Sequence, residues 1–265
     1  MVRPFQLIVL IFFFGLLAGC NEGGEKPAPG NVKIGELSPP SNSQSPELTR
    51  LKTMNFEVYA VEVPAENYAL FNDLWAVLYK PFHYRNYAAF RANYFQAGLG
   101  RETHWVEFRR IFEETKSKKL LSSTMMFFDG RPDNFEIGPI YGTQSIYYSV
   151  GESMNTAKIG PGVLVLQLVP QKIPGTKGIC TLTAVPKFTP PIVSTIPKLQ
   201  ERMQEKEVTF TDSALSVKLS PGEFIVLGPV KYIDNQTTLG GMLLSRPLPE
   251  PCVRLYVIVC TGIID

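Results

Sequence analysis

His83 and His104 are the two histidines of this 265-residue chain, so histidine-dependent acid–base or nucleophilic chemistry would have to use one of them. His83 lies close to Pro81 in an expected loop, and His104 stands at the expected start of a helix. A serine hydrolase also needs a serine on a tight turn, but residues 149–153 (Ser-Val-Gly-Glu-Ser) lack the Gly-x-Ser-x-Gly pattern. We therefore predict no catalytic residue and interpret His104 as a packed helix-start residue.

Two further patterns could bind ligands. Gly98-Leu99-Gly100 precedes an expected helix and could aim backbone N–H groups at a phosphate. It lacks a third glycine and a Walker lysine, so we interpret it as a tight strand-to-helix turn. Seven aromatic residues could line a glycan or peptide groove, although core or interface packing is the preferred interpretation. They are Phe82, Tyr84, Tyr87, Phe90, Tyr141, Tyr147 and Tyr148.

The cysteines set the possible redox and metal chemistry. Cys252 and Cys260 lie eight positions apart in an extended apolar segment, about 26 Å at ~3.3 Å per residue, so they should not bridge each other. Cys180 could form a disulfide with Cys252 or with Cys260 if its strand lies alongside. Equally, all three could be buried free thiols. Without a CxxC motif, and with two histidines, we predict no metal site and no cofactor.

The first twenty residues carry the most specific pattern of the chain. Arg3 precedes an apolar run from Phe5 to Leu17, which ends in Leu17-Ala18-Gly19-Cys20. A core of about a dozen apolar residues is typical of a signal peptide and shorter than the ~20 residues of a spanning helix. The segment resembles the signal and lipobox of bacterial lipoproteins. That resemblance implies cleavage before Cys20, lipidation of Cys20 with a diacylglycerol thioether and palmitate-type acyl chains, and attachment to a membrane.

The resemblance also predicts a location. Asn21, and not an aspartate, follows Cys20, which implies the outer membrane by analogy with the sorting rule of the best-known lipoproteins. Removing residues 1–19 leaves 25 basic and 24 acidic residues, because Arg3 is the one charge lost. A nearly neutral mature chain gives no indication of nucleic-acid binding.

Composition divides the rest of the chain into three parts. Residues 20–53 are rich in Gly, Pro, Ser and Asn and predict a disordered tether. Residues 54–140 predict a small α+β domain, with a strand at 56–63, a helix after Pro64, a strand at 93–100, a helix around 105–112 and a hairpin formed by 120–128 and 134–137.

Residues 141–265 predict a β-rich, sandwich-like domain. The expected strands are 145–150, 162–169, 178–185, 207–218, 222–230 and 252–261. Val163–Val169 and Val253–Val259 are apolar at both parities, which predicts central strands buried on both faces. Residues 189–206 predict an exposed, charged excursion. The expected fold class is therefore an α+β unit followed by a mainly-β domain behind a tether.

Three segments of this domain carry a second resemblance. Gly162–Pro170 and Gly178–Pro186 resemble the strand pair that opens the β-domain of outer-membrane secretins, and Ser220–Gly228 resembles a later strand of that family. The chain departs from the family because it has no Gly-rich gate segment and no pair of amphipathic hairpins with the ~9–11 alternating residues of a membrane strand. The resemblance implies a reduced, non-channel relative.

These patterns together predict a lipid-anchored structural or interaction protein of the cell envelope, without catalysis. Its expected partners are the membrane, through Cys20, and an envelope protein of unknown identity. The alternative is an envelope hydrolase or a solute-binding lipoprotein. That alternative requires His83 or His104 to meet an acid and a serine in one pocket.

Overall fold

The computed structural model describes residues 52–191, 206–247 and 249–264, which belong to one compact unit. The signal peptide 1–19, Cys20, the tether up to residue 51, and residues 192–205 of the charged excursion lie outside the described residues. None of the described helices is long and apolar enough to cross a membrane.

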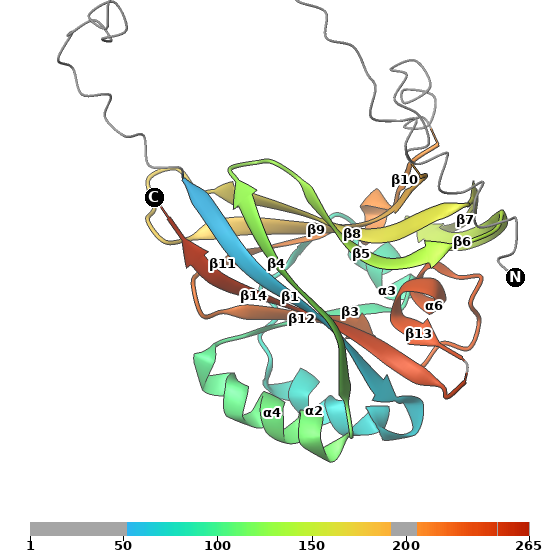
Figure 1. Cartoon of the computed structure of the whole chain (residues 1–265), viewed down its shortest axis with the longest axis horizontal. Coiled ribbons are helices and arrows are strands. Elements are labelled where there is room, and N and C mark those ends of the chain that lie inside the picture. Colours follow the sequence, from blue (N-terminus) through green and yellow to red (C-terminus); the bar gives the residue numbers. More distant parts are fainter. Residues whose placement is uncertain (1–51, 192–205, 248, 265) are drawn as a thin grey trace, which may run out of the picture. The chain divides into compact units, whose positions relative to one another are not determined.

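Two antiparallel sheets face each other and form a β-sandwich (Figure 1). The first sheet has the order β3 (Phe95–Gly100), β12 (Phe224–Pro229), β14 (Cys252–Ile263), β1 (Thr53–Pro64) and β4 (Lys118–Phe128), with β13 (Ser245–Arg246) beside β14. The second has the order β2 (His83–Tyr84), β11 (Leu215–Leu219), β9 (Cys180–Thr189), β8 (Gly162–Lys172) and β5 (Asp133–Ile140), with β10 (Val208–Thr209) beside β9. β6 (Gln144–Val150) and β7 (Ser153–Ile159) form a separate hairpin. The expected mainly-β, sandwich-like fold is confirmed.

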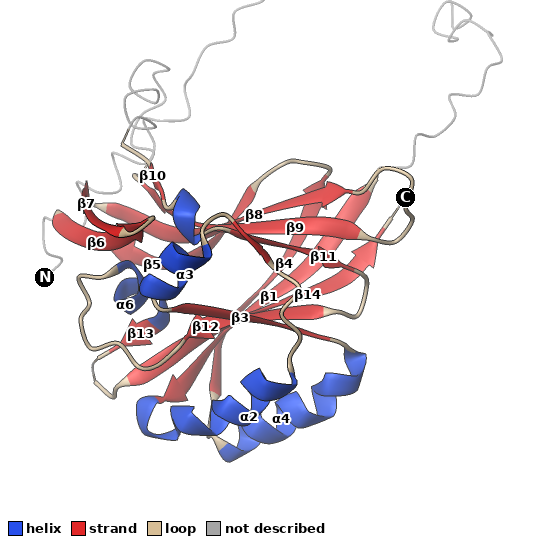
Figure 2. Cartoon of the chain, turned by 180° about the vertical axis from the view of Figure 1, so that it is seen from behind, coloured by secondary structure: helices blue, strands red, loops and turns tan. Residues whose placement is uncertain are grey.

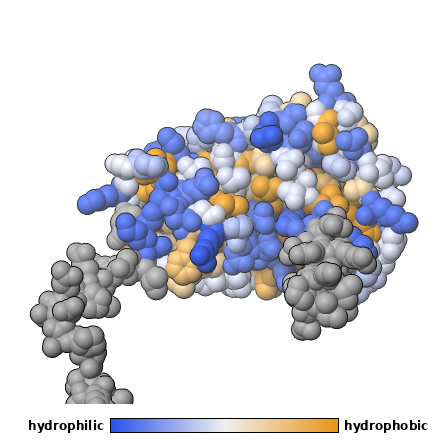
Figure 3. Space-filling view, turned by 90° about the horizontal axis from the view of Figure 1, so that it is seen from above, coloured by the Kyte–Doolittle hydropathy of each residue, from blue (hydrophilic) through white to orange (hydrophobic). Residues whose placement is uncertain are grey.

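The sandwich core follows the period of two that a strand imposes on its side chains. Every second residue of β9 from Cys180 to Phe188 is buried, and those between are half-buried. Met54, Phe56 and Val58 of β1 supply the opposing layer. On the outside of the second sheet, hydrophobic residues are interspersed with hydrophilic ones (Figure 3).

A layer of helices covers the other face of the first sheet (Figure 2). It consists of η2 (Ala65–Leu70), α2 (Phe71–Val77), η3 (Glu102–His104) and α4 (Trp105–Glu114). The helical spacing of their apolar residues places Leu74 and Phe108 against Val226 and Val257 of the sheet. Two other helices, α3 (Tyr87–Ala92) and α6 (Leu239–Leu244), lie at one end of the sandwich, where η4 (Thr211–Ser213) contacts α3.

β14 is buried on both faces, as its sequence predicts. Leu255 and Val257 face the helices, whereas Tyr256 and Ile258 face the sandwich core. β8 shares this property only in part, so the prediction for Val163–Val169 holds at its middle and fails at its ends. Its leucines point into the core and Val165 is 3% exposed, but Val163 and Val169 are half-buried, because the described helices cover the first sheet and not the second.

The two segments expected as separate domains contribute to the same sandwich. β1 pairs with β14 along nearly its whole length, β3 pairs with β12, and β5 pairs with β8. Residues 54–140 and 141–265 are therefore interleaved in both sheets. The physical reason is that the inward apolar residues of β1 and β4 are buried against those of β8 and β9.

Three local expectations differ from the structure. β4 and β5 do not form a hairpin, because the turn between them carries the chain from one sheet to the other and is held by Gly130 N–H donating to the Pro170 carbonyl at 2.9 Å. The expected strand 207–218 is split into β10 and β11 by η4. The sequence also did not reveal β7, whose residues Ser153–Thr156 are polar or exposed.

A charge in the doubly buried strand should prevent folding. Val257 is 1% exposed, so Val257→Asp would bury an unpaired carboxylate at a cost of several kcal/mol, against a typical domain stability of ~5–15 kcal/mol. We expect misfolded, protease-sensitive protein, whereas Lys206→Asp at an exposed position should be near neutral. Limited proteolysis of the two variants checks this, and equal resistance would contradict the burial of β14.

Candidate functional site at an open sheet edge

β4 is an edge strand whose outer side is free of other strands in the described part of the chain. It pairs with β1 on one side, from Thr53 opposite Phe128 to Glu62 opposite Lys118. Large apolar side chains along it reach the solvent: Leu120, Leu121, Met126 and Phe128 are 50%, 48%, 62% and 37% exposed. An unpaired edge with exposed apolar residues is a template to which another strand can add.

The first half of β4 differs from the second. Lys118 and Lys119 begin the strand, and Leu120 is bulged because Ala60 pairs with Leu121 and the next residue, Val61, with Lys119. Lysines and bulges are the usual means by which proteins protect an edge from indiscriminate pairing. The second half, Ser122–Phe128, is regular. The residues 121–128, which we call the β4 edge, therefore form the accessible stretch.

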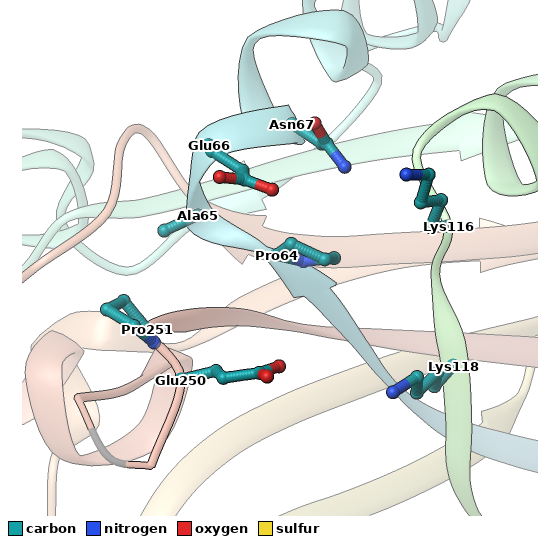
Figure 4. A pocket seen from close by; sticks show the side chains of 8 residues that line it. All are labelled: Pro64, Ala65, Glu66, Asn67, Lys116, Lys118, Glu250 and Pro251. Atoms are coloured by element: carbon teal, nitrogen blue, oxygen red, sulfur yellow. The ribbon is translucent and has the colours of Figure 1, made fainter.

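A pocket of about 560 Å³ lies where β4 begins. Lys116 and Lys118 extend into it from one side, and Glu66 and Glu250 from the other (Figure 4). The backbone segments that line the pocket are held together by Ala65 N–H, which donates to the Pro251 carbonyl at 2.9 Å. The separate ammonium and carboxylate groups can bind carboxylates and N–H donors of a polypeptide, so the pocket extends the β4 edge as a polar contact surface.

A buried ion cluster stabilises the sheet at the same end. The Glu62 side chain of β1 is 8% exposed and accepts two hydrogen bonds from Arg246, at 2.9 and 2.6 Å, and one from Arg254 at 3.2 Å. Burial on its own would raise the pKa of Glu62, but the hydrogen bonds and positive charges of both arginines outweigh it and hold this pKa below its ordinary value. The cluster joins β1, β13 and β14.

The two histidines lie apart from each other. His83 is exposed on β2, where its backbone pairs with Ser216. His104 accepts a hydrogen bond from Arg101 N–H at 3.0 Å and packs edge-on against Tyr79, which is a helix-start role. Within residues 52–191, 206–247 and 249–264, neither imidazole forms a hydrogen bond or an ion pair with a carboxylate, so the arrangement required for a hydrolase is not formed there.

Ser149 belongs to a buried polar network. Its N–H donates to Asn93 Oδ1 at 2.7 Å, and Asn93 Nδ2 donates in turn to Ser213 Oγ at 2.9 Å. Asp212 accepts from Gly151 N–H at 2.9 Å. These bonds attach the β6–β7 hairpin to α3 and η4, so the network is structural.

Gly98 and Gly100 lie inside β3 and not in a strand-to-helix turn. A side chain at Gly98 would come within 2.7 Å of Leu78, and one at Gly100 within 2.1 Å of the Phe224 ring. Gly98 is therefore required by the packing of Leu78, at the end of α2, on the sheet, and Gly100 by its cross-strand neighbour Phe224 of β12. The position of the two glycines gives no support to a phosphate loop.

The seven aromatic residues do not converge on one groove. Phe82 and Phe90 are buried in the sandwich core, and the Tyr84 and Phe90 ring centroids are 4.7 Å apart. Tyr148 packs against Phe210 with centroids 5.0 Å apart. The members at least 40% exposed are Tyr87, Tyr141 and Tyr147. Packing is thus the main role of this group.

All three described cysteines are buried thiols. Cys180 and Cys260 lie in the sandwich core, and each thiol shifts the pKa of the other. Cys252 is at the opposite end of β14, near Arg246 and the Glu250 carbonyl. The described residues contain no group of three or more His, Cys, Asp or Glu side chains placed to hold a metal ion.

Comparison with known proteins gives weak likenesses of fold. No family model and no curated protein matches the sequence. The secretin-domain β-barrel of InvG from the Salmonella SPI-1 injectisome NC-base matches with a TM-score of 0.26 and 9% identity, over 81% of this chain and 64% of that chain. The type IV competence pilus secretin PilQ of V. cholerae matches with a TM-score of 0.25 and 11% identity, over 99% and 66%.

This chain thus spans about two thirds of each of these two secretin chains. The resemblance to secretin β-domains is a weak structural one, and scores of this size do not place the chain in that family.

Sequence reasoning did not identify the β4 edge. The run Leu120–Phe128 has apolar residues at both parities, which suggests a buried strand as readily as an exposed one. The signal that could have separated the two is the pair Lys118-Lys119 at the beginning of the strand, because adjacent lysines are typical of edges.

The ion cluster predicts a pH-dependent loss of stability. Glu62→Gln should lower the free energy of unfolding at pH 7 by about 2 kcal/mol, less than for a fully buried pair because Arg246 and Arg254 are partly exposed. Since the pKa of Glu62 is depressed by folding, its contribution is present above the unfolded-state pKa of about 4.3 and lost as the pH falls through the folded-state value. Urea unfolding from pH 7 to pH 3 measures the difference.

The matched control is Glu107→Gln, which removes an exposed carboxylate that also pairs with an arginine, Arg110, and should leave stability unchanged. A constant difference between wild type and Glu62→Gln over the whole pH range would contradict the ionised cluster.

Proposed function

We propose that this chain is a lipid-anchored structural or interaction protein of the bacterial cell envelope, held at the outer membrane through Cys20. The lipobox resemblance supports the anchor, and the resemblance of three strands to secretin β-domains agrees with an envelope location. The observation that carries the interaction role is the open β4 edge with its exposed apolar side chains.

The partner that fits the β4 edge is an extended segment of another envelope protein. Such a segment would add a strand to the first sheet and use main-chain hydrogen bonds for affinity. Its apolar side chains would cover Leu121, Met126 and Phe128, which are exposed now. Acidic or polar residues at its end would meet Lys118 and the adjoining pocket. Both faces of β12 and β14 are already covered, so β4 is where a further strand can join the first sheet.

Anchoring is tested by removing the lipidated sulfur. Cys20→Ser should abolish labelling with a palmitate analogue and move the protein from the detergent phase to the aqueous phase, because a diacylated cysteine is the proposed attachment. Cys252→Ser, a change at a buried thiol, should retain the label. Cys20→Ser protein that stays in membranes after high salt and mild alkali would refute the anchor.

Partner binding is tested by photo-crosslinking in cells that produce the full chain. A crosslinking residue at Leu121 should give a heterologous adduct, and one at Val106 on α4, 81% exposed, should not. Met126→Asp should lower the yield at position 121 at least several-fold, because it places a charge in the contact. Met154→Asp is the matched control, since Met154 on β7 is 64% exposed against 62% for Met126.

An adduct at position 121 that Met126→Asp and Met154→Asp weaken equally would contradict the β4 edge. A product with the mass of two copies of this chain would contradict a heterologous partner. The absence of any adduct in the envelope fraction would refute the interaction itself.

A further inference from the structure

The two sheets of the sandwich meet at a corner that holds two cysteines. Cys180 begins β9 in the second sheet, and Cys260 lies near the end of β14 in the first. Both residues are 0% exposed and belong to the same core between the sheets. Their side chains therefore approach each other from opposite layers.

The short connection between β11 and β12 joins the two sheets at this corner. Leu219, the last residue of β11, pairs with Cys180. The chain then crosses from the second sheet to the first in residues 220–223, and Cys260 N–H donates to the Glu223 carbonyl at 3.0 Å. Gly222 N–H donates to the Cys260 carbonyl at 2.8 Å. With so few residues between these two contacts, the backbones at Cys180 and Cys260 are held close, and both side chains enter the same core.

We propose that Cys180 and Cys260 form a disulfide that joins the two sheets, and that Cys252 remains a thiol. The pairing rests on the proposed envelope location, because disulfides persist in oxidising compartments. The oxidant is a disulfide-carrying protein or small molecule. One thiolate attacks its disulfide to give a mixed disulfide, and the second thiolate displaces the carrier. Both cysteines lose a proton and together two electrons, and the disulfide of the carrier is reduced to two thiols.

The bond forms while the sheets are still apart. In the closed sandwich the Cys180 thiol is out of reach of an oxidant, and its hydrogen bond with Cys260 together with burial raises its pKa far above the ordinary value. Cys260 is 0% exposed as well, so neither thiol is accessible to an oxidant in the folded state. Once formed, the bond is protected from reductants by the same burial.

Cys252 is excluded by position. It lies eight residues from Cys260 on β14, at the end where Arg246 Nη2 is 3.5 Å from its sulfur. A strand of that length separates the two sulfurs by much more than a disulfide spans. The sequence left Cys252 and Cys260 as alternative partners of Cys180, and the corner geometry favours Cys260.

The disulfide should raise thermal stability considerably. It closes a loop of about 80 residues and so restricts the unfolded chain, which stabilises the folded state. Reduction removes this stabilisation and should lower the Tm by about 10 °C. Full-length protein is extracted from membranes in detergent without reductant, denatured, alkylated and analysed by peptide mass spectrometry. We expect one linked pair, Cys180 with Cys260, and an alkylated Cys252.

The Tm with and without reductant provides a second readout. Wild type and Cys252→Ala should both lose about 10 °C on reduction, and the double variant Cys180→Ala/Cys260→Ala should show no reductant dependence. Refolding the purified full chain in a mixture of oxidised and reduced glutathione tests the disulfide independently of the proposed envelope location. A bond formed there but absent in cell extracts would overturn the envelope location only.

Three alkylated cysteines in both the extracted and the refolded chain would overturn the disulfide, as would a Cys180–Cys252 pair. If the double variant does not fold, the thiol count of the wild-type protein decides the question.

Discussion

The position of β14 at the centre of the first sheet is the constraint on which the rest of the structure depends. It hydrogen-bonds to β1 on one side and to β12 and β13 on the other. Its alternating side chains reach two separate cores, the helix layer through Leu255 and Val257 and the sandwich through Tyr256 and Ile258. Neither core can be complete until this C-terminal strand is in place, so the whole described unit depends on a pairing between its two ends.

Two interactions, an ion pair and apolar burial, select the register of the pairing between β1 and β14. In the observed register Glu62 lies opposite Arg254, and Ala60 lies opposite Tyr256. A shift by one residue would turn the Glu62 carboxylate toward the apolar helix layer and remove it from its arginines. It would also turn the apolar residues of β1 that now face the sandwich core away from that core. Charge pairing and apolar burial therefore favour one register, and the ion cluster fixes the end of the sheet beside which the pocket lies.

The two edge strands of the first sheet differ in how their outer side is protected. At one edge, Leu99 of β3 exchanges hydrogen bonds with Tyr79, at 2.8 and 2.9 Å. At the other edge, β4 has lysines and a bulge at its start and an accessible regular stretch beyond it. The proposed interaction surface thus lies on a rigid strand whose position is fixed by β1, and it needs no rearrangement of the core to accept another strand.

Much of the fold could be predicted because local patterns carry it. Helices were predicted after Pro64 and around 105–112, and Leu74 and Phe108 lie on the buried faces of the helices found there. The apolar run Val253–Val259 predicted a strand buried on both sides. The resemblance of residues 17–20 to a lipobox is likewise a local pattern, and the lipidation of Cys20 that it implies stays a prediction. These conclusions needed no knowledge of which elements meet.

The tertiary structure decided which of these elements contact each other. Composition suggested a boundary near residue 140, but the pairing of β1 with β14 places both segments in one sandwich. Val163–Val169 read as doubly buried, yet its outer face is only half-covered because the described helices lie on the other sheet. The openness of the β4 edge and the approach of Cys180 to Cys260 likewise depend on contacts between residues far apart in sequence. The sequence alone determined most of the described strands and helices, though not β7 or the break between β10 and β11. Partners across sheets follow from burial of the whole chain, which no local window contains.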